Sequence, residues 1–263
     1  PAYKAQRPPM PEELRSQVSI VRDIVSALGF PLVEMSGYEA DDVIGTLARQ
    51  GQAAGWEIDI VSGDLDMLQL VNRNVTLLHT AKGGADAIIA YDEARVEARF
   101  GLIPAQMVDF KSLKGDPSDN IPGVPGVGEK TAAKLIGTFG SLAALYERLD
   151  EVEPERIRTL LRDHRDAAFA GQGLMTIDCS APVELPETGG EIGSYDRDRA
   201  LALLRDAYRL VRAAGDFLRP FAGKAGCLLH FFSGRRRFIH CGGGLGRAGD
   251  DFRQRDDDFA GGC

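Results

Sequence analysis

Seven acidic side chains in three short blocks are the residues of this chain whose types and spacing best fit a chemical role. The blocks are 39–42 (Glu-Ala-Asp-Asp), 64–66 (Asp-Leu-Asp) and 116–119 (Asp-Pro-Ser-Asp). Carboxylates that a fold brings together repel one another unless cations lie between them, and carboxylate oxygens are preferred ligands of Mg²⁺. We interpret the acids as metal ligands. The seven are Glu39, Asp41, Asp42, Asp64, Asp66, Asp116 and Asp119.

Each acidic block also has a purely structural explanation. The acids of 39–42 fit the first turn of a helix, those of 64–66 fit a helix cap, and those of 116–119 fit a turn. The pair in 64–66 is also similar to the aspartates of haloacid-dehalogenase phosphatases, but Leu68 stands where that family has Thr. Because one metal centre explains all three blocks together, we favour the metal interpretation.

The segment 121–131, Ile-Pro-Gly-Val-Pro-Gly-Val-Gly-Glu-Lys-Thr, follows the third block. It is not a triphosphate-binding loop, because Glu129 separates the last glycine from Lys130 and no strand precedes it. We interpret it as the hairpin of a helix–hairpin–helix element, whose backbone N–H groups bind nucleic-acid phosphate without sequence preference. Lys130 and Lys134 lie one helical turn apart, which favours this interpretation over a plain Pro/Gly loop.

The hydrophobic pattern predicts the elements that must position these residues. Helices are expected at 11–28, 39–54, 65–71, 92–100, 104–113, 129–137, 141–149, 154–171 and 198–214, and strands at 30–35, 56–61, 75–80 and 87–91. Strands that alternate with helices predict an α/β fold, with a mostly parallel sheet flanked by helices and then a helical region. After residue 216 neither period is visible, so we expect a disordered tail, of the kind that a gene read out of frame would produce.

Composition limits the functional classes. A hydrophobic share of 44% and a charged share of 27% are typical of a soluble globular protein, and no apolar run or signal peptide indicates a membrane or secretory route. We therefore expect a cytoplasmic protein. The net charge of −8 argues against a nucleic-acid partner unless bound cations cancel it. The four cysteines form no disulfide framework, and adjacent His240 and Cys241 disfavour a zinc site in the tail.

These motifs, in this order, resemble the 5′-nuclease domain of bacterial DNA polymerase I, a member of the flap-endonuclease superfamily. The resemblance covers about residues 1–215. The blocks that carry it are Tyr3-Lys4-x-x-Arg7-Pro8-Pro9, Glu39-Ala-Asp-Asp42, Gly63-Asp64-x-Asp66, Gly115-Asp116-x-Ser118-Asp119-Asn120 and the segment 121–131.

The resemblance implies a metal-dependent 5′-3′ exonuclease or flap endonuclease that hydrolyses DNA and RNA primers in replication and repair. It implies two Mg²⁺ ions, with Mn²⁺ as the alternative, and a K⁺ ion at the hairpin. Glu39, Asp41, Asp42 and Asp64 would surround the first metal ion, and Asp66, Asp116 and Asp119 the second. The implied DNA-binding residues are Tyr3, Lys4 and Arg7 at the base of a helical arch, and Gly123, Gly126, Gly128, Lys130, Thr131 and Lys134 at the hairpin. The implied partners are DNA with a 5′ flap or nick and RNA primer–DNA hybrids, bound by a monomer.

One departure from the family concerns its first strand, which carries an Asp ligand and has no counterpart here. We therefore expect a fragment with an open sheet edge, and the alternative function is a DNA-junction binder without catalysis. The expected domains are a truncated α/β core at 1–100 with an arch remnant at 1–28, a helix–hairpin–helix region at 101–215, and an irregular tail at 216–263.

Overall fold

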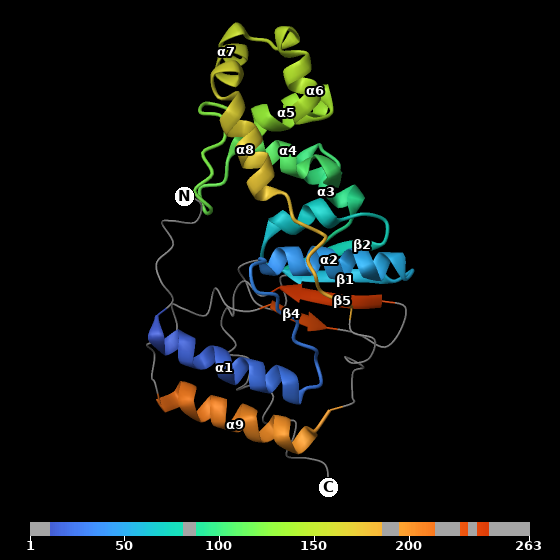
Figure 1. The fold of residues 1–263 in the computed structure, drawn as a ribbon, viewed down its shortest axis with the longest axis vertical. Coiled ribbons are helices and arrows are strands. Elements are labelled where there is room, and N and C mark those ends of the chain that lie inside the picture. Colours follow the sequence, from blue (N-terminus) through green and yellow to red (C-terminus); the bar gives the residue numbers. More distant parts are fainter. Residues whose placement is uncertain (1–10, 81–87, 186–194, 214–226, 231–235, 242–263) are drawn as a thin grey trace. The chain divides into compact units, whose positions relative to one another are not determined.

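The computed structural model describes residues 11–80, 88–185, 195–213, 227–230 and 236–241 (Figure 1). These residues divide into two compact units. A sheet unit contains the described parts of 11–65, 77–90 and the chain after 179, whereas a helical unit contains 66–76 and 91–178.

The helices of the structure are α1 (Glu12–Ala27), α2 (Ala40–Ala53), α3 (Glu93–Phe100), α4 (Met107–Lys114), α5 (Glu129–Phe139), α6 (Leu142–Glu147), α7 (Glu155–Asp163), α8 (Arg165–Met175) and α9 (Arg197–Ala213). The short 3₁₀ helices within the described residues are η1 (Leu65–Leu70), η3 (Pro104–Gln106) and η4 (Leu149–Glu151). The strands are β1 (Glu57–Ser62), β2 (Val75–Thr80), β3 (Ile88–Tyr91), β4 (Cys227–His230) and β5 (Arg236–Cys241).

The sheet has the strand order β3-β2-β1-β5-β4. Strand β5 runs parallel to β1 in a register that pairs Glu57 with Arg236 and Ser62 with Cys241, and β4 is antiparallel to β5. Alternating Ile58 and Ile60 are almost fully buried in β1. Helix α2 packs against β1 and β5, and its apolar stripe of Val43, Ile44, Leu47 and Ala48 is buried. This α/β arrangement confirms the predicted fold class.

Two long-range connections complete the sheet unit. Helices α1 and α9, far apart in the sequence, pack side by side (Figure 1). The segment that follows residue 180 is attached to α2, because Gln50 donates to the Val183 carbonyl at 2.7 Å and accepts from the Leu185 N–H at 2.7 Å. Thr46 Oγ1 also accepts from the Ala181 N–H at 3.0 Å.

In the helical unit, α4 is the central element, because it packs against both α5 and α8. Phe110 and Leu113 of α4 are fully buried. Asp109 joins two neighbours to this helix: its carboxylate accepts from the Leu142 N–H at 2.9 Å and from Gln172 Nε2 at 2.5 Å. Helix α4, which carries Lys111 and Lys114 in its last turn, is therefore fixed from several sides.

The structure corrects three predictions about the elements. Residues 30–35 form no strand; both neighbours of β1 in the sheet are other strands, and Pro31 offers no N–H to a ladder. The single helix predicted at 154–171 is two helices that meet at His164. The tail was expected to be irregular, yet β4 and β5 lie in the tail and β5 pairs with β1. Much of the rest of the tail lies outside the described residues.

Among the described helices, none is long and apolar enough to span a membrane.

Candidate metal and nucleic-acid site

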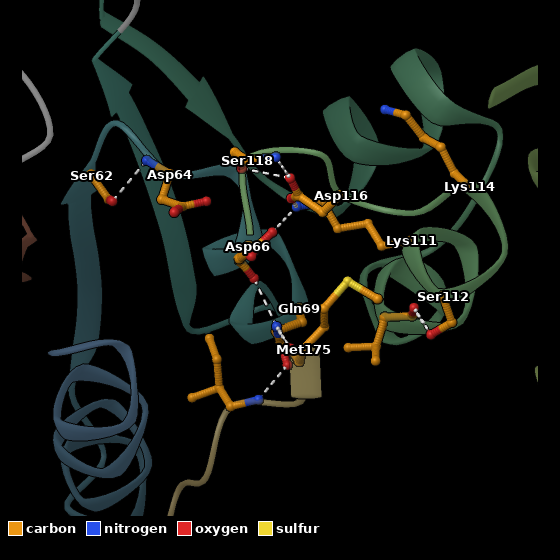
Figure 2. A network of polar contacts seen from close by, with 12 residues as sticks. Ser62, Asp64, Asp66, Gln69, Lys111, Ser112, Lys114, Asp116, Ser118 and Met175 are labelled. Atoms are coloured by element: carbon orange, nitrogen blue, oxygen red, sulfur yellow. Dashed lines mark hydrogen bonds and ion pairs between the residues drawn. The ribbon is translucent and has the colours of Figure 1, made fainter. Parts of the chain in front are cut away.

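The carboxylates of Asp66 and Asp116 share one cation, the ammonium of Lys111 (Figure 2). Lys111 Nζ forms an ion pair with Asp66 Oδ1 and lies 3.1 Å from Asp116 Oδ2. All three side chains are only 15–16% exposed. The structure therefore brings together one acid from the second block and one from the third, as the metal interpretation requires, and a positive charge already lies between them.

Asp66 is positioned by the short helix η1. Met67 and Leu68, which follow it directly, are fully buried, so the backbone next to Asp66 is anchored in the core. Gln69 adds a second attachment, because its Nε2 donates to the Asp66 and Met175 carbonyls at 3.0 Å each. Its Oε1 accepts from the Ile177 N–H at 3.0 Å. The end of α8 is thus tied to η1.

Asp116 lies in a closed loop that begins where α4 ends. The backbone groups of Asp116 and Ile121 form two mutual hydrogen bonds of 2.8 and 2.9 Å. Within the loop, Asp116 Oδ1 accepts from Ser118 N at 2.9 Å and Ser118 Oγ at 2.5 Å (Figure 2). Asp119 belongs to the same turn, since its N–H donates to the Asp116 carbonyl at 3.2 Å. Asn120 adopts a left-handed φ of +61°, which Asn tolerates better than most residues.

These contacts determine the charge state of Asp116. Burial on its own would raise the pKa of this carboxyl group. The hydrogen bonds from Ser118 and the charge of Lys111 outweigh burial, so the pKa lies below the ordinary value of 3.8. Asp116 is therefore an anion at neutral pH, the form that a metal ion requires.

The acids of the first block cap a helix. Asp42 Oδ2 accepts from the Glu39 N–H at 3.0 Å, and the two residues form a capping box at the start of α2. Asp41 lies in the same first turn, where the helix dipole favours negative charge. Asp64 follows β1, and its N–H donates to Ser62 Oγ at 3.0 Å. The structural explanation of the first-block acids as residues of a helix start therefore holds, and it is compatible with a further role.

The predicted ligand set is divided between the two units. Glu39, Asp41, Asp42 and Asp64 belong to the sheet unit, whereas Asp66, Asp116 and Asp119 belong to the helical unit. Across the parts of the chain that the structure describes, no three His, Cys, Asp or Glu side chains form a group that could hold one ion. The ligand assignment for the full set of seven therefore stays a prediction, and the structure supports it most directly at the Asp66–Asp116 pair.

The glycine-rich segment forms a tight turn between α4 and α5. Gly123 has φ +62° and Gly126 has φ +83°, conformations that side-chain-bearing residues rarely adopt. A Cβ on Gly123 would lie 2.3 Å from the backbone nitrogen of Gly115, so the two chain segments touch. Val124 and Val127 are buried beneath the turn and hold it against the helices.

The outer side of this turn is exposed. Gly128 is the N-cap of α5; it has an ordinary φ of −87°, and a Cβ placed there would meet nothing within 4 Å. The packing of the chain therefore does not require a glycine at this position. Lys130 and Lys134 are exposed and Thr131 is partly exposed on the first turns of α5. The N–H groups of this helix start and two cations face solvent, the arrangement that suits a phosphate.

Sequence reasoning missed two contributors, Lys111 and Ser118. No sequence pattern assigned a role to Lys111, and Ser118 appeared only as part of a motif. The available signal was the position of Lys111 in the last turn of a helix that runs directly into Asp116. Three predicted DNA-binding residues, Tyr3, Lys4 and Arg7, lie outside the described residues.

Comparison with known proteins identifies the family. A family model described as the 5′-3′ exonuclease N-terminal resolvase-like domain matches residues 1–101, and one described as the 5′-3′ exonuclease C-terminal SAM fold matches residues 102–198. The chain belongs to the 5′-3′ exonuclease family.

Relatives of this chain include DNA polymerases I. The chain is 42% identical over 204 residues to DNA polymerase I of Bacillus caldotenax, which is 78% of the chain and 23% of that relative. It is 46% identical over 206 residues to DNA polymerase I of Chloroflexus aurantiacus, 78% of the chain and 22% of the relative. The chain thus spans about a quarter of the length of the relatives it matches.

Solved structures share its fold. The T5 D15 protein co-crystallized with metal ions has a TM-score of 0.57 and 18% identity, and the match covers 80% of this chain and 77% of that one. The T5 5′-exonuclease with divalent zinc has a TM-score of 0.57, 19% identity and the same coverage. The catalytic core of Rad2 in complex with DNA substrate has a TM-score of 0.50 at 15% identity, over 76% of this chain and 66% of that one.

Proposed function

We propose that this chain is the nuclease part of a DNA polymerase I-like protein and hydrolyses phosphodiester bonds at a 5′ flap or nick, in DNA and in RNA primers. The observation that carries the proposal is the Asp66–Asp116 pair, two largely buried carboxylates that face each other across a cation. Membership of the 5′-3′ exonuclease family supports the reaction class.

The residues present fit a divalent ion at this pair. Both donors are carboxylate oxygens, the hydrogen bonds and charge around Asp116 keep it ionised, and the ammonium of Lys111 shows that a cation is accommodated between them. Asp66, Asp116 and Asp119 would hold one Mg²⁺ ion, and the acids of the sheet unit a second; Mn²⁺ would serve as well. When bound, such ions lower the pKa of an attacking water and stabilise charge on the reacting phosphate.

The chain's own contribution is to position these groups and the nucleic acid. The closed loop around Asp116 and the attachment of η1 through Gln69 hold the backbone segments that carry the two carboxylates. The start of α5, with Gly128 and exposed Lys130 and Lys134, would hold duplex phosphates, with a K⁺ ion at the turn. Tyr3, Lys4 and Arg7 would contact the single-stranded 5′ end. We expect a cytoplasmic monomer.

A second candidate function is junction binding without cleavage. It is favoured by one observation: in the described ranges no third acid joins Asp66 and Asp116 in a group that could hold an ion. Both candidates require binding to a duplex that carries a 5′ flap, whereas only the nuclease requires turnover.

The deciding experiment is cleavage of an end-labelled 5′-flap duplex by the purified chain with Mg²⁺, with Mn²⁺ and with EDTA. The Asp116→Ala variant should lose cleavage and keep most of the binding. Asp150→Ala is the matched control, because the Asp150 carboxylate belongs to the same unit and is 96% exposed. Metal-dependent cleavage by the wild type and the control but not by Asp116→Ala supports the nuclease. Flap binding without cleavage by any variant supports the junction binder.

A further inference from the structure

The ammonium of Lys111 neutralises only part of the charge that surrounds it. Two carboxylate groups, those of Asp66 and Asp116, meet a single ammonium, so the formal charges of the three side chains sum to −1. At 15–16% exposure they are poorly screened by water, and the remaining charge is correspondingly costly. A divalent ion at the same place would neutralise both carboxylates.

Both acidic residues are anchored by contacts other than those with Lys111, Asp116 through its backbone and side chain and Asp66 through its backbone. Asp116 is held by the backbone pair with Ile121 and by the two hydrogen bonds from Ser118. Asp66 is held by the buried neighbours in η1 and by Gln69. The pair would therefore stay together, and would go on attracting a cation, if the lysine side chain moved away.

Lys111 is able to move away. Its ammonium ends a flexible four-carbon stem, and its hydrogen bonds to the carboxylates are made only by that terminal group. The stem starts from the last turn of α4, whose fixed backbone does not need to change when the side chain adopts another rotamer.

We propose that Lys111 is a built-in counter-ion that competes with the divalent ion for Asp66 and Asp116. In the metal-free chain it reduces the repulsion between the carboxylates, and metal entry displaces it. The lysine is thus a positioning residue that lowers the metal affinity of this pair. The inference rests on the proposed function, because it assumes that the pair binds a divalent ion.

The test measures Mn²⁺ affinity of the full chain by titration calorimetry for wild type and four variants. Lys111→Gln removes the charge and should bind Mn²⁺ about tenfold more tightly, the effect expected for loss of one partly buried competing charge. Lys111→Arg keeps the charge and should stay near wild type. Lys114→Gln is the matched control, because Lys114 lies on the same helix but pairs with Glu129 at 3.3 Å; its affinity should change by less than about twofold. Asp66→Asn should lose the site.

The unfolding temperature is a second measurement, which shows whether each variant is folded. In EDTA, Lys111→Gln should unfold at a lower temperature than wild type, and Mn²⁺ should raise its unfolding temperature more than that of wild type. If Lys111→Gln binds Mn²⁺ no more tightly than wild type, the inference about Lys111 is overturned. In that case, loss of Mn²⁺ binding in Asp66→Asn would still support the proposed metal site at Asp66 and Asp116. If Asp66→Asn binds Mn²⁺ as tightly as every other variant, the metal assignment itself fails, and the inference fails with it.

Discussion

Replacement of Gly123 by Ala should destabilise the helical unit by about 2–5 kcal/mol. Gly123 has φ +62°, and an L-residue in the left-handed region costs about 1–2 kcal/mol. The new Cβ would lie 2.3 Å from Gly115 N, 2.6 Å from the Lys114 carbonyl carbon and 2.7 Å from Gly115 Cα. These atoms belong to the backbone and cannot rotate away, so overpacking adds about 1–3 kcal/mol. The sum is a large part of the stability of a small domain.

The matched control is the same substitution five positions later. Gly128 has φ −87°, and its added Cβ would meet nothing within 4 Å. Gly128→Ala should therefore cost less than about 1 kcal/mol, mostly through the poorer N-cap preference of Ala. Both variants add the same methyl group within the same turn. The difference between their unfolding free energies therefore reports the cost of the left-handed conformation and of the contact with Gly115.

Hydrogen exchange read by mass spectrometry is the assay, because peptides from α4 and α5 report the unfolding free energy of this unit directly. Urea unfolding followed by the single tryptophan, Trp56, reports the sheet unit separately. Equal protection of α4 and α5 in Gly123→Ala and Gly128→Ala would refute the reasoning. Gly128→Ala has a further use: if the start of α5 contacts phosphate, it should weaken duplex binding although stability is nearly unchanged.

Three further predictions concern single contacts. Ser118→Ala should raise the pKa of Asp116 toward 3.8 in a ¹³C NMR carboxyl titration; because the folded pKa is depressed, the stability lost is seen at neutral pH and disappears as pH falls through that pKa. Gln69→Ala should cost about 1–3 kcal/mol by leaving its backbone partners unpaired, with faster hydrogen exchange at Ile177. Burial raises the pKa of the Tyr146 phenol to about 12, so an ultraviolet absorbance titration of the wild type should include one phenol that ionises at that pH. The Tyr146→Phe variant should lack this transition.

Elements bounded by strong local signals could be predicted from the sequence. Helix α5 begins at Glu129, as predicted, because Gly128 ends the turn and a continuous apolar stripe follows. The strands at 57–62 and 75–80 follow their hydrophobic pattern closely. The break at His164 was missed because no Gly or Pro marks it, although five consecutive polar residues, 162–166, interrupt the apolar pattern there.

Pairings between distant segments could not be predicted. Strand β5 exists because β1 offers it a partner, and the sequence Arg-Arg-Phe-Ile-His-Cys has no alternation of its own to reveal this. The candidate site shows the same limit. The third block predicted Asp116 from local spacing, whereas the pairing of Lys111 with Asp66 joins residues 45 positions apart. Such a contact depends on how α4 packs, which no local pattern specifies.

The parallel pairing of β1 with β5 has a consequence for biosynthesis. Strand β1 leaves the ribosome early, but its neighbour is one of the last described segments to be made. At ordinary rates of bacterial elongation, on the order of 10–40 s separate the two events. Throughout that interval one edge of β1 has unpaired backbone groups next to apolar Ile58 and Ile60, the kind of edge that recruits foreign strands. We therefore expect nascent chains that stop before residue 236 to depend more heavily on chaperones than the finished protein does.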